Sequence, residues 1–374
     1  MQVSVKSSQQ VIKEANTKLV FGFIHKHGPI SRADIKKNTK LSATTVSSLV
    51  EELLADGFIK KTGIKNTSTS GRKAVLLSIN PDGGYFVGID IKSGVVSADT
   101  YALDFTPVFH LDIPISENEN PALSVLRALS SASKGKNILG ITIGLPGVVD
   151  AYTNSVISST VIDAETVKDI YRTVSEAMPN TKLNLRNNSG LVAYAEKEFG
   201  VHGDVDNLIS IDIDDGVGAG IVIGGLIHSG ASGMAGEFGH ITIDYKGDKC
   251  KCGNYGCLEL AASIPAILKK SKSKSLVEVC EKLSAGDKLA YDTIDDVARA
   301  LAFGINNINN IVDPQFIVIC GPVRVLGDFL LTPLQKYIDS ISLIKNKPIK
   351  YSAIEGNAVT LGGARVAFDE MFRV

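Results

Sequence analysis

The chain contains few cysteines, and this scarcity excludes the disulfide-rich scaffolds of small secreted proteins. Only five cysteines occur in 374 residues. Long apolar runs are also absent, since stretches such as GIVIGGLIH are too short to span a bilayer. The first residues, MQVSVKSSQQ, are polar and do not resemble a secretory leader. We therefore expect a cytoplasmic protein with no membrane partner, in a compartment where thiols stay reduced.

The net charge of −1 hides an asymmetry between the two ends of the chain. Residues 1–80 contain 13 Lys and Arg against 5 Asp and Glu, whereas the remainder contains 26 against 35. A basic head on an acidic body indicates two functions, and nucleic acid is the usual partner of such a head. A solvated basic surface without a partner would explain the charge of the head equally well.

The basic head has the pattern of a helix-turn-helix. Residues 8–27 place apolar side chains at helical spacing, and His27–Gly28–Pro29 ends that helix. Ser31 begins a short second helix with an approximate capping box. Ser42 caps a third helix, ATTVSSLVEELLADG, which Gly57 closes. Two short helices separated by a tight turn predict a DNA-binding motif.

The third helix has an apolar face and a hydroxyl-rich face. We expect its buried positions to be Val46, Leu49, Val50 and Leu53. The N-terminal half of a recognition helix is where side chains meet base edges. The candidate DNA contacts of the helix-turn-helix are Arg32, Thr44, Thr45, Ser47 and Ser48. Hydroxyl groups lack the bidentate discrimination of arginine on guanine, so this helix alone should read sequence weakly.

The segment after the third helix resembles the β-wing of a winged helix. Apolar residues near Phe58–Ile59 and at Ala74–Ile79 flank a polar loop that ends in Arg72 and Lys73. Basic side chains after small, flexible residues suit a narrow, electronegative minor groove. We expect Arg72 and Lys73 to contact DNA, either through the shape of A·T-rich sequence or through phosphates alone.

Two similar hairpins indicate a duplicated body. Ile89–Val95 reads IDIKSGV and Ile211–Val217 reads IDIDDGV, each with an aspartate in a strand just ahead of a turn. Chance similarity of two hairpins is the alternative. Together with the helices that come after them, the repeat fits a duplicated βββαβα unit, which resembles the actin-like, hexokinase-like architecture. In that superfamily the two turns bind ATP phosphates and a sugar lies between two lobes.

One histidine and three cysteines have the spacing of a metal site. His240, Cys250, Cys252 and Cys257 supply one nitrogen and three sulfurs, with Gly253 and Gly256 in the turns between the cysteines. A Cys₃His set forms a closed tetrahedral zinc site, which stabilises structure and leaves no position for a substrate. We therefore predict a structural Zn²⁺ ion.

The motifs AGEFGH and CKCGNYGCLE resemble the signature of the ROK family (repressors, open reading frames, kinases). GLPGVVD, DDGVGAGIVIGGLIHSG and FIVICGPV also occur in family order. With the winged head, the whole chain is similar to the sugar-responsive repressors of the family, the xylose repressor type especially. The resemblance implies a winged helix-turn-helix (residues 1–80) joined to an α/β actin-like body (residues 81–374) with lobes of roughly 81–187 and 188–374.

The resemblance also implies a sugar site. In the family the histidine of the GH pair ligates metal and lies against the sugar, and two glutamates bond sugar hydroxyls. A further segment, ENDAN in the kinases, corresponds here to residues 186–190. The sugar-binding candidates are Asn187, Asn188, Glu237, His240 and Glu259. The alternatives are that Glu259 caps the following helix and that Glu237 supports the metal site.

Three departures from the kinases indicate that the chain is not an enzyme. The catalytic base of the kinases is an aspartate, and Asn188 stands in its place, although an amide cannot accept the proton. The phosphate-binding turns read Lys92–Ser93–Gly94 and Asp214–Asp215–Gly216. Two carboxylates repel a triphosphate unless Mg²⁺ bridges them. We therefore expect no ATP cofactor and no catalytic residue.

These patterns together predict a sugar-responsive repressor of a carbohydrate-use operon. We expect double-stranded operator DNA and a small sugar inducer as its partners, and a homodimer or dimer of dimers as its assembly. Two alternatives remain open at this point. One is a sugar kinase with an appended DNA-binding head, and the other is a constitutive DNA-binding protein whose body only oligomerises.

Overall fold

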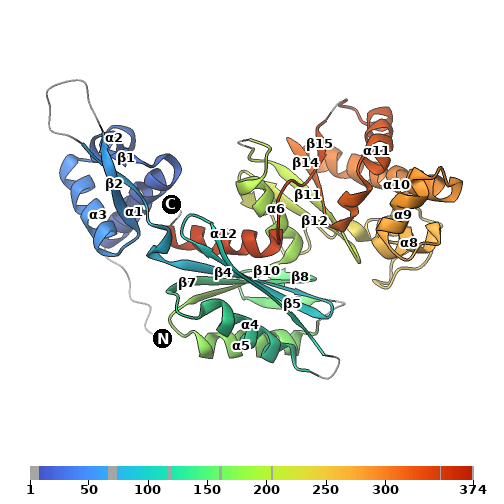
Figure 1. Ribbon diagram of the computed structural model, residues 1–374. Coiled ribbons are helices and arrows are strands. Elements are labelled where there is room, and N and C mark those ends of the chain that lie inside the picture. Colours follow the sequence, from blue (N-terminus) through green and yellow to red (C-terminus); the bar gives the residue numbers. More distant parts are fainter. Residues whose placement is uncertain are drawn as a thin grey trace. The chain divides into compact units, whose positions relative to one another are not determined.

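The computed structural model describes residues 8–65, 74–116, 119–159, 162–203, 205–345 and 347–372 (Figure 1). The chain forms two compact units. The first unit comprises Met1–Ile143, Glu165–Asn184 and Gly363–Val374. The second unit comprises Gly144–Ala164 and Leu185–Gly362. A search of the described ranges finds no helix that is long and apolar enough to cross a membrane.

The first unit begins with the helix-turn-helix that the sequence predicts. Its elements are α1 (Ser8–His27), β1 (Ile30–Ser31), α2 (Arg32–Thr39), α3 (Ala43–Ala55), β2 (Ile59–Lys65) and β3 (Ala74–Ile79). The strands form a sheet of order β1-β3-β2, in which β2 and β3 are antiparallel. The expected hairpin of a winged helix is therefore present beside the three helices.

Side-chain caps define where the two short helices begin. Ser31 Oγ accepts a hydrogen bond from the backbone N–H of Asp34 at 3.2 Å, and Ser42 Oγ accepts one from Thr45 at 3.0 Å. Each bond satisfies a donor that a helix leaves without an intrahelical partner. Between the helices Lys40 adopts a left-handed conformation with φ of 59°. The capping residues predicted from the sequence thus have that role in the fold.

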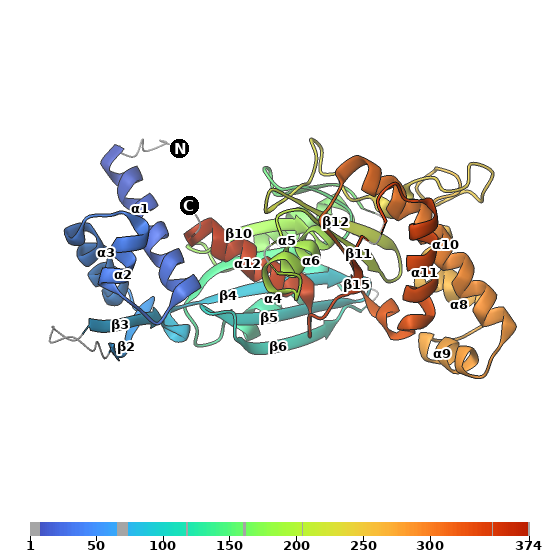
Figure 2. The same cartoon turned by 90° about the horizontal axis from the view of Figure 1, so that it is seen from above.

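A five-stranded sheet of order β10-β7-β4-β5-β6 forms the rest of the first unit, with the ends of β7 and β10 belonging to the second. Figure 2 shows β4, β5 and β6 side by side. The strands are β4 (Tyr85–Lys92), β5 (Val95–Ala102), β6 (Pro107–Pro114), β7 (Ile138–Leu145) and β10 (Lys182–Asn187). The helices α4 (Pro121–Ser133) and α5 (Ala164–Ala177) cover one face, and α12 (Ala358–Phe372), from Gly363 onward, covers the other (Figure 1).

The second unit contains a sheet with the same plan, of order β13-β12-β11-β14-β15. Its strands are β11 (Leu208–Ile213), β12 (Val217–Ile223), β13 (Leu226–Ile227), β14 (Phe316–Cys320) and β15 (Ile349–Tyr351). In both sheets the first strand is central, the next two strands extend to one side, and the last two extend to the other. The duplication predicted from the two IDI hairpins is therefore confirmed.

Helices and a small hairpin complete the second unit. The helices are α6 (Asn188–Phe199), α7 (Glu259–Ala262), α8 (Ile264–Ser271), α9 (Leu276–Ser284), α10 (Lys288–Val312) and α11 (Asp328–Ile341), and the hairpin is β8 (Val148–Asp150) with β9 (Ser155–Ser158). α6 lies very close to β12, because a Cβ added at Gly220 would be only 1.9 Å from Ser189 O. Glycine is therefore required at position 220.

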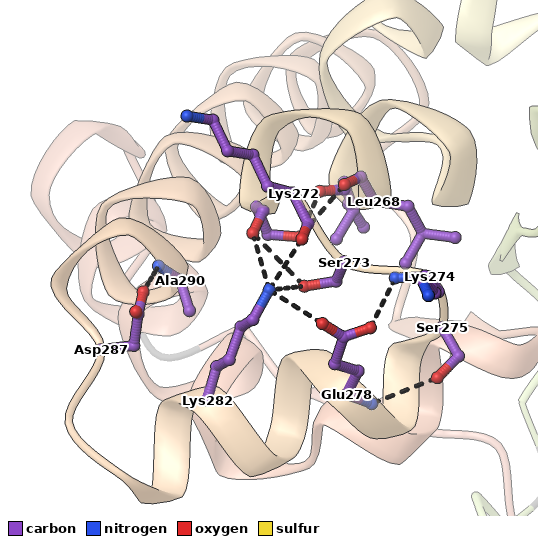
Figure 3. Close-up of polar contacts among 11 residues, drawn as sticks. Leu268, Lys272, Ser273, Lys274, Ser275, Glu278, Lys282, Asp287 and Ala290 are labelled. Atoms are coloured by element: carbon purple, nitrogen blue, oxygen red, sulfur yellow. Dashed lines mark hydrogen bonds and ion pairs between the residues drawn. The ribbon is translucent and has the colours of Figure 1, made fainter.

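A lysine holds the turn between α8 and α9 in place (Figure 3). Lys282 Nζ donates to the carbonyl of Lys272 at 2.7 Å and to Ser273 Oγ at 2.9 Å, and it pairs with Glu278 at 3.0 Å. A cationic side chain that binds the last carbonyls of a helix is a favourable C-cap. The turn is thus ordered by contacts within the second unit.

An aromatic cluster joins the helix-turn-helix to the rest of the first unit. Its ring contacts connect six phenylalanines: Phe21, Phe58, Phe86, Phe105, Phe368 and Phe372. Phe21 of α1 stacks on Phe372 of α12 with ring centroids 4.0 Å apart, and both side chains are buried. The last helix of the chain therefore shares a core with the first helix.

Candidate functional site

The N-terminal half of α3 presents hydroxyl groups to solvent. Thr44, Ser47 and Ser48 are exposed and Thr45 is half-buried. On the opposite face the four predicted apolar residues are all buried. The division of this helix into two faces thus agrees with the sequence prediction, and the exposed hydroxyls lie where a recognition helix contacts DNA.

Arg32, the basic candidate on α2, has a partner within the head. Its Nη2 pairs with Glu51 Oε1 at 2.6 Å, which links α2 to α3. A DNA contact by Arg32 would therefore compete with this ion pair. The other two basic candidates, Arg72 and Lys73, lie outside the described residues.

The structure brings the four predicted metal ligands into one cluster. The ligand atoms of His240, Cys250, Cys252 and Cys257 all lie within 4.8 Å of one another. Cys252 Sγ is 3.7 Å from Cys257 Sγ, and His240 Nδ1 is 3.9 Å from Cys250 Sγ. Tetrahedral zinc–sulfur bonds of about 2.3 Å place sulfur atoms about 3.8 Å apart. The donor set and its spacing therefore fit one tetrahedral metal ion.

Tight turns form the loop that carries the three cysteines. The carbonyl of Cys250 accepts from Gly253 N at 3.0 Å, and Gly253 has a φ of 95°. A Cβ at Gly256 would lie 1.6 Å from the carbonyl oxygen of Asp244, so only glycine fits there. Burial, followed by the neighbouring Cys252 and Cys250, raises the pKa of Cys257 to about 12. A divalent cation would stabilise the thiolate form of these cysteines, of which Cys250 and Cys257 are buried and Cys252 is exposed.

A carboxylate lies on the other side of the His240 ring from the cysteines. Nδ1 of His240 faces Cys250, whereas Nε2 is 3.8 Å from Glu237 Oε2. Metal-binding histidines commonly direct their second nitrogen toward a carboxylate, which orients the ring. Glu237 therefore has the position of a group that supports the metal site, which is the alternative interpretation of this residue in the sequence.

Two glutamates come close together beside this histidine. Burial raises the pKa of Glu237; the charge of His240 opposes the shift, and the charge of Glu259 adds to it. Glu259 is the first residue of α7, but its Oε2 accepts from the backbone N–H of Val217 at 3.4 Å rather than capping its own helix. Glu237, His240 and Glu259 thus form a polar group in the second unit, adjacent to the cysteine cluster.

The two predicted asparagines lie at the start of α6. Asn187 is the N-cap residue: its Oδ1 accepts from Gly190 N at 3.0 Å, and its Nδ2 donates to the carbonyl of Gly147 at 2.8 Å. Asn188 is the first residue of the helix and is half-buried. The sequence prediction for Asn187 did not include capping, although an asparagine directly ahead of a helix is the signal that could have indicated it.

A narrow pocket opens beside the first turn of α6 within the second unit. Its cavity volume is only about 20 Å³, which is room for about one water molecule. Its polar lining includes Arg186, Asn187, His228 and Ser229. The remaining lining residues are small or apolar: Val149, Gly190, Ala219, Gly220, Ile221, Ile227, Gly233 and Ala235. The pocket thus combines the start of α6 with residues of β12 and the loop that leads to Glu237.

The two hairpin turns differ in charge and in shape. In the first unit Ser93 and Gly94 form a two-residue turn, and Gly94 has a φ of 78°. In the second unit Asp214 N donates to the carbonyl of Gly216 at 2.9 Å, and Asp215 is exposed. The second turn thus presents a carboxylate to solvent, whereas the first turn consists of a serine and a glycine.

Comparisons with known proteins agree with this architecture. The sequence profile of the ROK family matches residues 116–368. The xylose repressor of Caldicellulosiruptor bescii is 30% identical, over 96% of this chain and 97% of that protein. Both matches extend through the cysteine cluster.

Solved structures show two kinds of similarity. A ROK family transcriptional regulator, described as a homologue of the E. coli MLC protein, superposes with a TM-score of 0.85 and 28% identity over 97% of both chains. A ROK family glucokinase from Streptomyces griseus, with a TM-score of 0.67 and 23% identity, covers 76% of this chain and 99% of its own. The regulator therefore matches nearly the whole chain, whereas the kinase shares the fold over three quarters of it.

Proposed function

Because this chain belongs to the ROK family, we propose that it is a sugar-responsive transcriptional repressor of a carbohydrate-use operon. The observation that carries the proposal is the full-length similarity to a ROK transcriptional regulator, which includes the helix-turn-helix. The similarity to a protein named xylose repressor supports the same function and makes a pentose the first inducer to test. A repressor of this kind acts in the cytoplasm, where its operator lies.

Residues 1–80 act as the DNA-binding domain in this proposal, and residues 81–374 act as the sensing body. The hydroxyl groups of Thr44, Thr45, Ser47 and Ser48 contact base edges, with Arg32, Arg72 and Lys73 contributing charge. The outward position of the hydroxyls on α3 supports this assignment. Hydroxyl contacts discriminate bases weakly, so one head alone gives little affinity.

In this proposal the protein is a homodimer, whose second head adds the affinity for DNA that one head alone lacks. Two heads related by a two-fold axis read two half-sites, and half-sites one helical turn apart or a multiple of it match such a dimer. The weak readout by each α3 supports this assembly. Light scattering on the free protein and footprinting on its operator test it together, and a monomer with a single protected half-site would refute it.

The sugar inducer contacts Glu237, His240 and Glu259, with Asn187 and Asn188 beside them. Carboxylates and imidazole bind neutral hydroxyls well, and the proximity of Glu237, His240 and Glu259 supports the site. The inducer shifts the equilibrium between DNA-binding and released states by its differential affinity for them. The inducer therefore cannot lower the affinity for DNA by more than the ratio of its own affinities for the two states.

The metal in the cysteine cluster is Zn²⁺ and its role is structural. Three sulfurs and Nδ1 of His240 complete a tetrahedral set, which leaves no coordination position for a substrate. The ion orients the His240 ring, and Glu237 supports it from the other side. Zinc thereby stabilises the cysteine loop and also fixes the positions of His240 and Glu237, two of the proposed sugar-binding residues.

Phosphoryl transfer is not part of the proposed function. Asn188 provides no base, and the Asp214–Asp215–Gly216 turn places carboxylates where phosphate binding needs N–H donors. The relatives named repressors support a regulator without catalytic residues and without ATP.

Fluorescence anisotropy on DNA from upstream of the gene tests the proposal. We expect tight binding at fixed salt that one member of a panel of pentoses, hexoses and amino sugars releases. Replacing both Ser47 and Ser48 by alanine should weaken operator binding by about thirtyfold or more, since two lost hydrogen bonds of about 1 kcal/mol each add to about 2 kcal/mol per head. Ser284→Ala, an exposed serine at the end of α9, is the matched control and should change nothing.

Two outcomes would count against the proposal in different ways. Operator binding that no sugar relieves would favour a constitutive DNA-binding protein. Absence of any specific DNA binding, combined with phosphorylation of a sugar in the presence of ATP and Mg²⁺, would favour the kinase.

A further inference from the structure

The recognition helix α3 is acidic, although the head around it is basic. Its sequence, ATTVSSLVEELLA, contains Glu51 and Glu52 and no lysine or arginine. Carboxylates on a helix that enters the major groove repel the phosphates on both sides of that groove. Two glutamates on α3 therefore lower its affinity for DNA unless their charge is compensated.

Each glutamate pairs with a cation from another helix of the head, in which α1, α2 and α3 lie together (Figure 1). Glu51 Oε1 is 2.6 Å from Nη2 of Arg32 on α2. Glu52 Oε2 is 2.9 Å from Nζ of Lys13 on α1. Because an ion pair is neutral overall, it repels distant phosphates much less than a free carboxylate does. The two pairs thus allow α3 to approach DNA.

Only Glu51 lies on the face of α3 that we expect to meet DNA. Side chains at intervals of three or four residues share one side of a helix. The exposed residues with this spacing are Thr44, Ser47, Ser48 and Glu51. Glu52 is directed toward α1 by its ion pair. The Glu51 side chain is 65% exposed, and among the described residues its Oε2 has no hydrogen-bond partner.

Arg32 is placed to support Glu51 rather than to extend toward DNA. It is the first residue of α2, directly after the Ser31 cap. A cation at the N-terminus of a helix interacts unfavourably with the helix dipole, so helix stability does not explain an arginine there. Its side chain is only 29% exposed, and its Nε is buried. The guanidinium therefore packs against the head with Nη2 on Glu51.

We infer that Glu51 determines sequence specificity: its Oε2 accepts a hydrogen bond from the amino group of a cytosine in the major groove, and Arg32 positions and neutralises the carboxylate. The inference rests on the proposed function, because it assigns a base contact to the recognition helix of the repressor. Cytosine offers a donor at N4, whereas adenine places an N7 acceptor beside its N6 donor. A carboxylate, which only accepts, therefore fits cytosine and is repelled by adenine N7.

Selection from a pool of randomised operators measures the base preference of the full-length protein. At one position of each half-site the wild type should favour cytosine about fivefold or more, as expected for one base contact. Glu51→Gln should weaken binding to that operator about fivefold or more and shift the preference there to adenine, because an amide both donates to N7 and accepts from N6. Glu52→Gln, which removes the other ion pair of α3, is the matched control and should keep every base preference.

Substitution of Arg32 tests its supporting role. Arg32→Gln leaves the Glu51 carboxylate without its cation, so affinity should fall about fivefold for all operators alike while the preference for cytosine persists. Arg32→Lys keeps a positive charge and should restore part of the affinity. Partly exposed ion pairs contribute little to stability, so thermal denaturation should show both variants folded. The base preference of Glu51→Gln stands as a test even if a variant of Arg32 fails to fold.

The alternative is that Arg32 contacts a phosphate and that Glu51 only holds it back from DNA in the free protein. In that case Glu51→Gln would bind DNA more tightly with unchanged base preferences, and Arg32→Gln would reduce the salt slope of binding by about 1. Either result would overturn the inference. Equal changes in Glu51→Gln and Glu52→Gln would also overturn it, since they would reflect the charge of α3 and not a base contact.

The selection with the wild-type protein separates this inference from the proposed function. A pool from which no operator is enriched would refute DNA recognition itself, and with it the repressor. An enriched operator whose base preferences Glu51→Gln leaves in place would keep the repressor and remove only the role of Glu51.

Discussion

The two five-stranded sheets share one strand order but differ in the segment that leaves their third strand. After β6 ends at Pro114, α4 begins at Pro121. After β13 ends at Ile227, the corresponding long helix α10 begins only at Lys288. The additional segment contains the cysteine cluster, Glu237 and Glu259. The duplicated scaffold thus provides two equivalent positions, and among the described residues only one of them carries the candidate site.

The hairpin turns of the two sheets show the same divergence on a smaller scale. Asp90 and Asp212 occupy equivalent positions in β4 and β11. The following turn closes with Ser93 and Gly94 in one sheet and contains Asp214 and Asp215 in the other. Keeping the strands while changing the turns preserves the core and alters the chemistry, since loop residues bear little of the packing.

Loss of the metal cluster should give the largest difference in stability between the units that contain the two sheets. Replacing both Cys250 and Cys257 by serine should abolish metal binding and destabilise the second unit by at least about 3 kcal/mol, because the ion stabilises a loop of tight turns. Metal analysis and chemical denaturation measure both effects. Cys280→Ser, on α9 and outside the cluster, is the control. A double variant that keeps its stability would show that the loop does not need the metal.

The aromatic cluster should have the next largest effect, confined to the first unit. Phe372→Ala should cost about 3 kcal/mol, the usual range for a buried phenylalanine, since its ring stacks on Phe21. It should leave metal content unchanged. Phe303→Ala provides the comparison, because Phe303 on α10 is 48% exposed. Denaturation curves that shift equally for both variants would contradict the role of the cluster in joining α1 to α12.

His110 and Asp99, at the edge of the first sheet, should make a smaller, pH-dependent contribution to the free energy of unfolding. The hydrogen bond to Asp99 raises the pKa of His110, and partial burial opposes it. The pair therefore stabilises the fold fully below the unfolded pKa near 6.5 and loses this contribution as pH rises through the higher folded pKa. Because the His110 side chain is 60% exposed, the effect should stay below about 1 kcal/mol.

Unfolding free energies between pH 5 and 9 measure this contribution. His110→Asn should flatten the profile in that range, whereas His228→Asn, at an exposed position of the second unit, should leave the wild-type slope. An unchanged slope in His110→Asn would assign the pH dependence to other groups.

Restoring the kinase base should have no measurable effect. Asn188→Asp supplies the carboxylate that proton transfer requires, but the turn at Asp214–Asp215–Gly216 still repels a triphosphate. We expect no phosphorylation of any sugar in a coupled assay with ATP and Mg²⁺. Activity in this variant would mean that the acidic turn tolerates the nucleotide, with Mg²⁺ as the bridge.

Local patterns in the sequence were sufficient for the winged head and for the candidate ligands. Ser31 and Ser42 cap their helices, as expected, because a cap involves residues only three positions apart. The short spacing of the cysteines likewise brings them together through two glycine turns. Equivalent hairpins pointed to the duplicated sheets, since both repeats retain the aspartate and the glycine.

Contacts between residues far apart in the chain were not predictable in this way. Glu196 Oε2 lies 3.1 Å from His202 Nε2, and Glu196 Oε1 lies 3.8 Å from Cys320 Sγ, in the core of the second unit. Burial is the main cause that raises the pKa of Cys320 well above its ordinary value. No spacing rule relates Cys320 to Glu196, so this polar cluster exists only in the folded chain.

The sequence by itself determined the helix-turn-helix, the repeated hairpins and the grouping of one histidine with three cysteines at a spacing that fits a metal ion. These features depend on residue type and on short spacing along the chain, because the geometry of a helix, strand or turn follows directly from the residues that form it. Only the tertiary structure decided that Phe372 completes the core of the head, that Asn187 caps α6 and that Arg186 lines a pocket. Those outcomes depend on which distant segments pack together, and packing is chosen by the burial of the whole chain rather than by any short stretch of it.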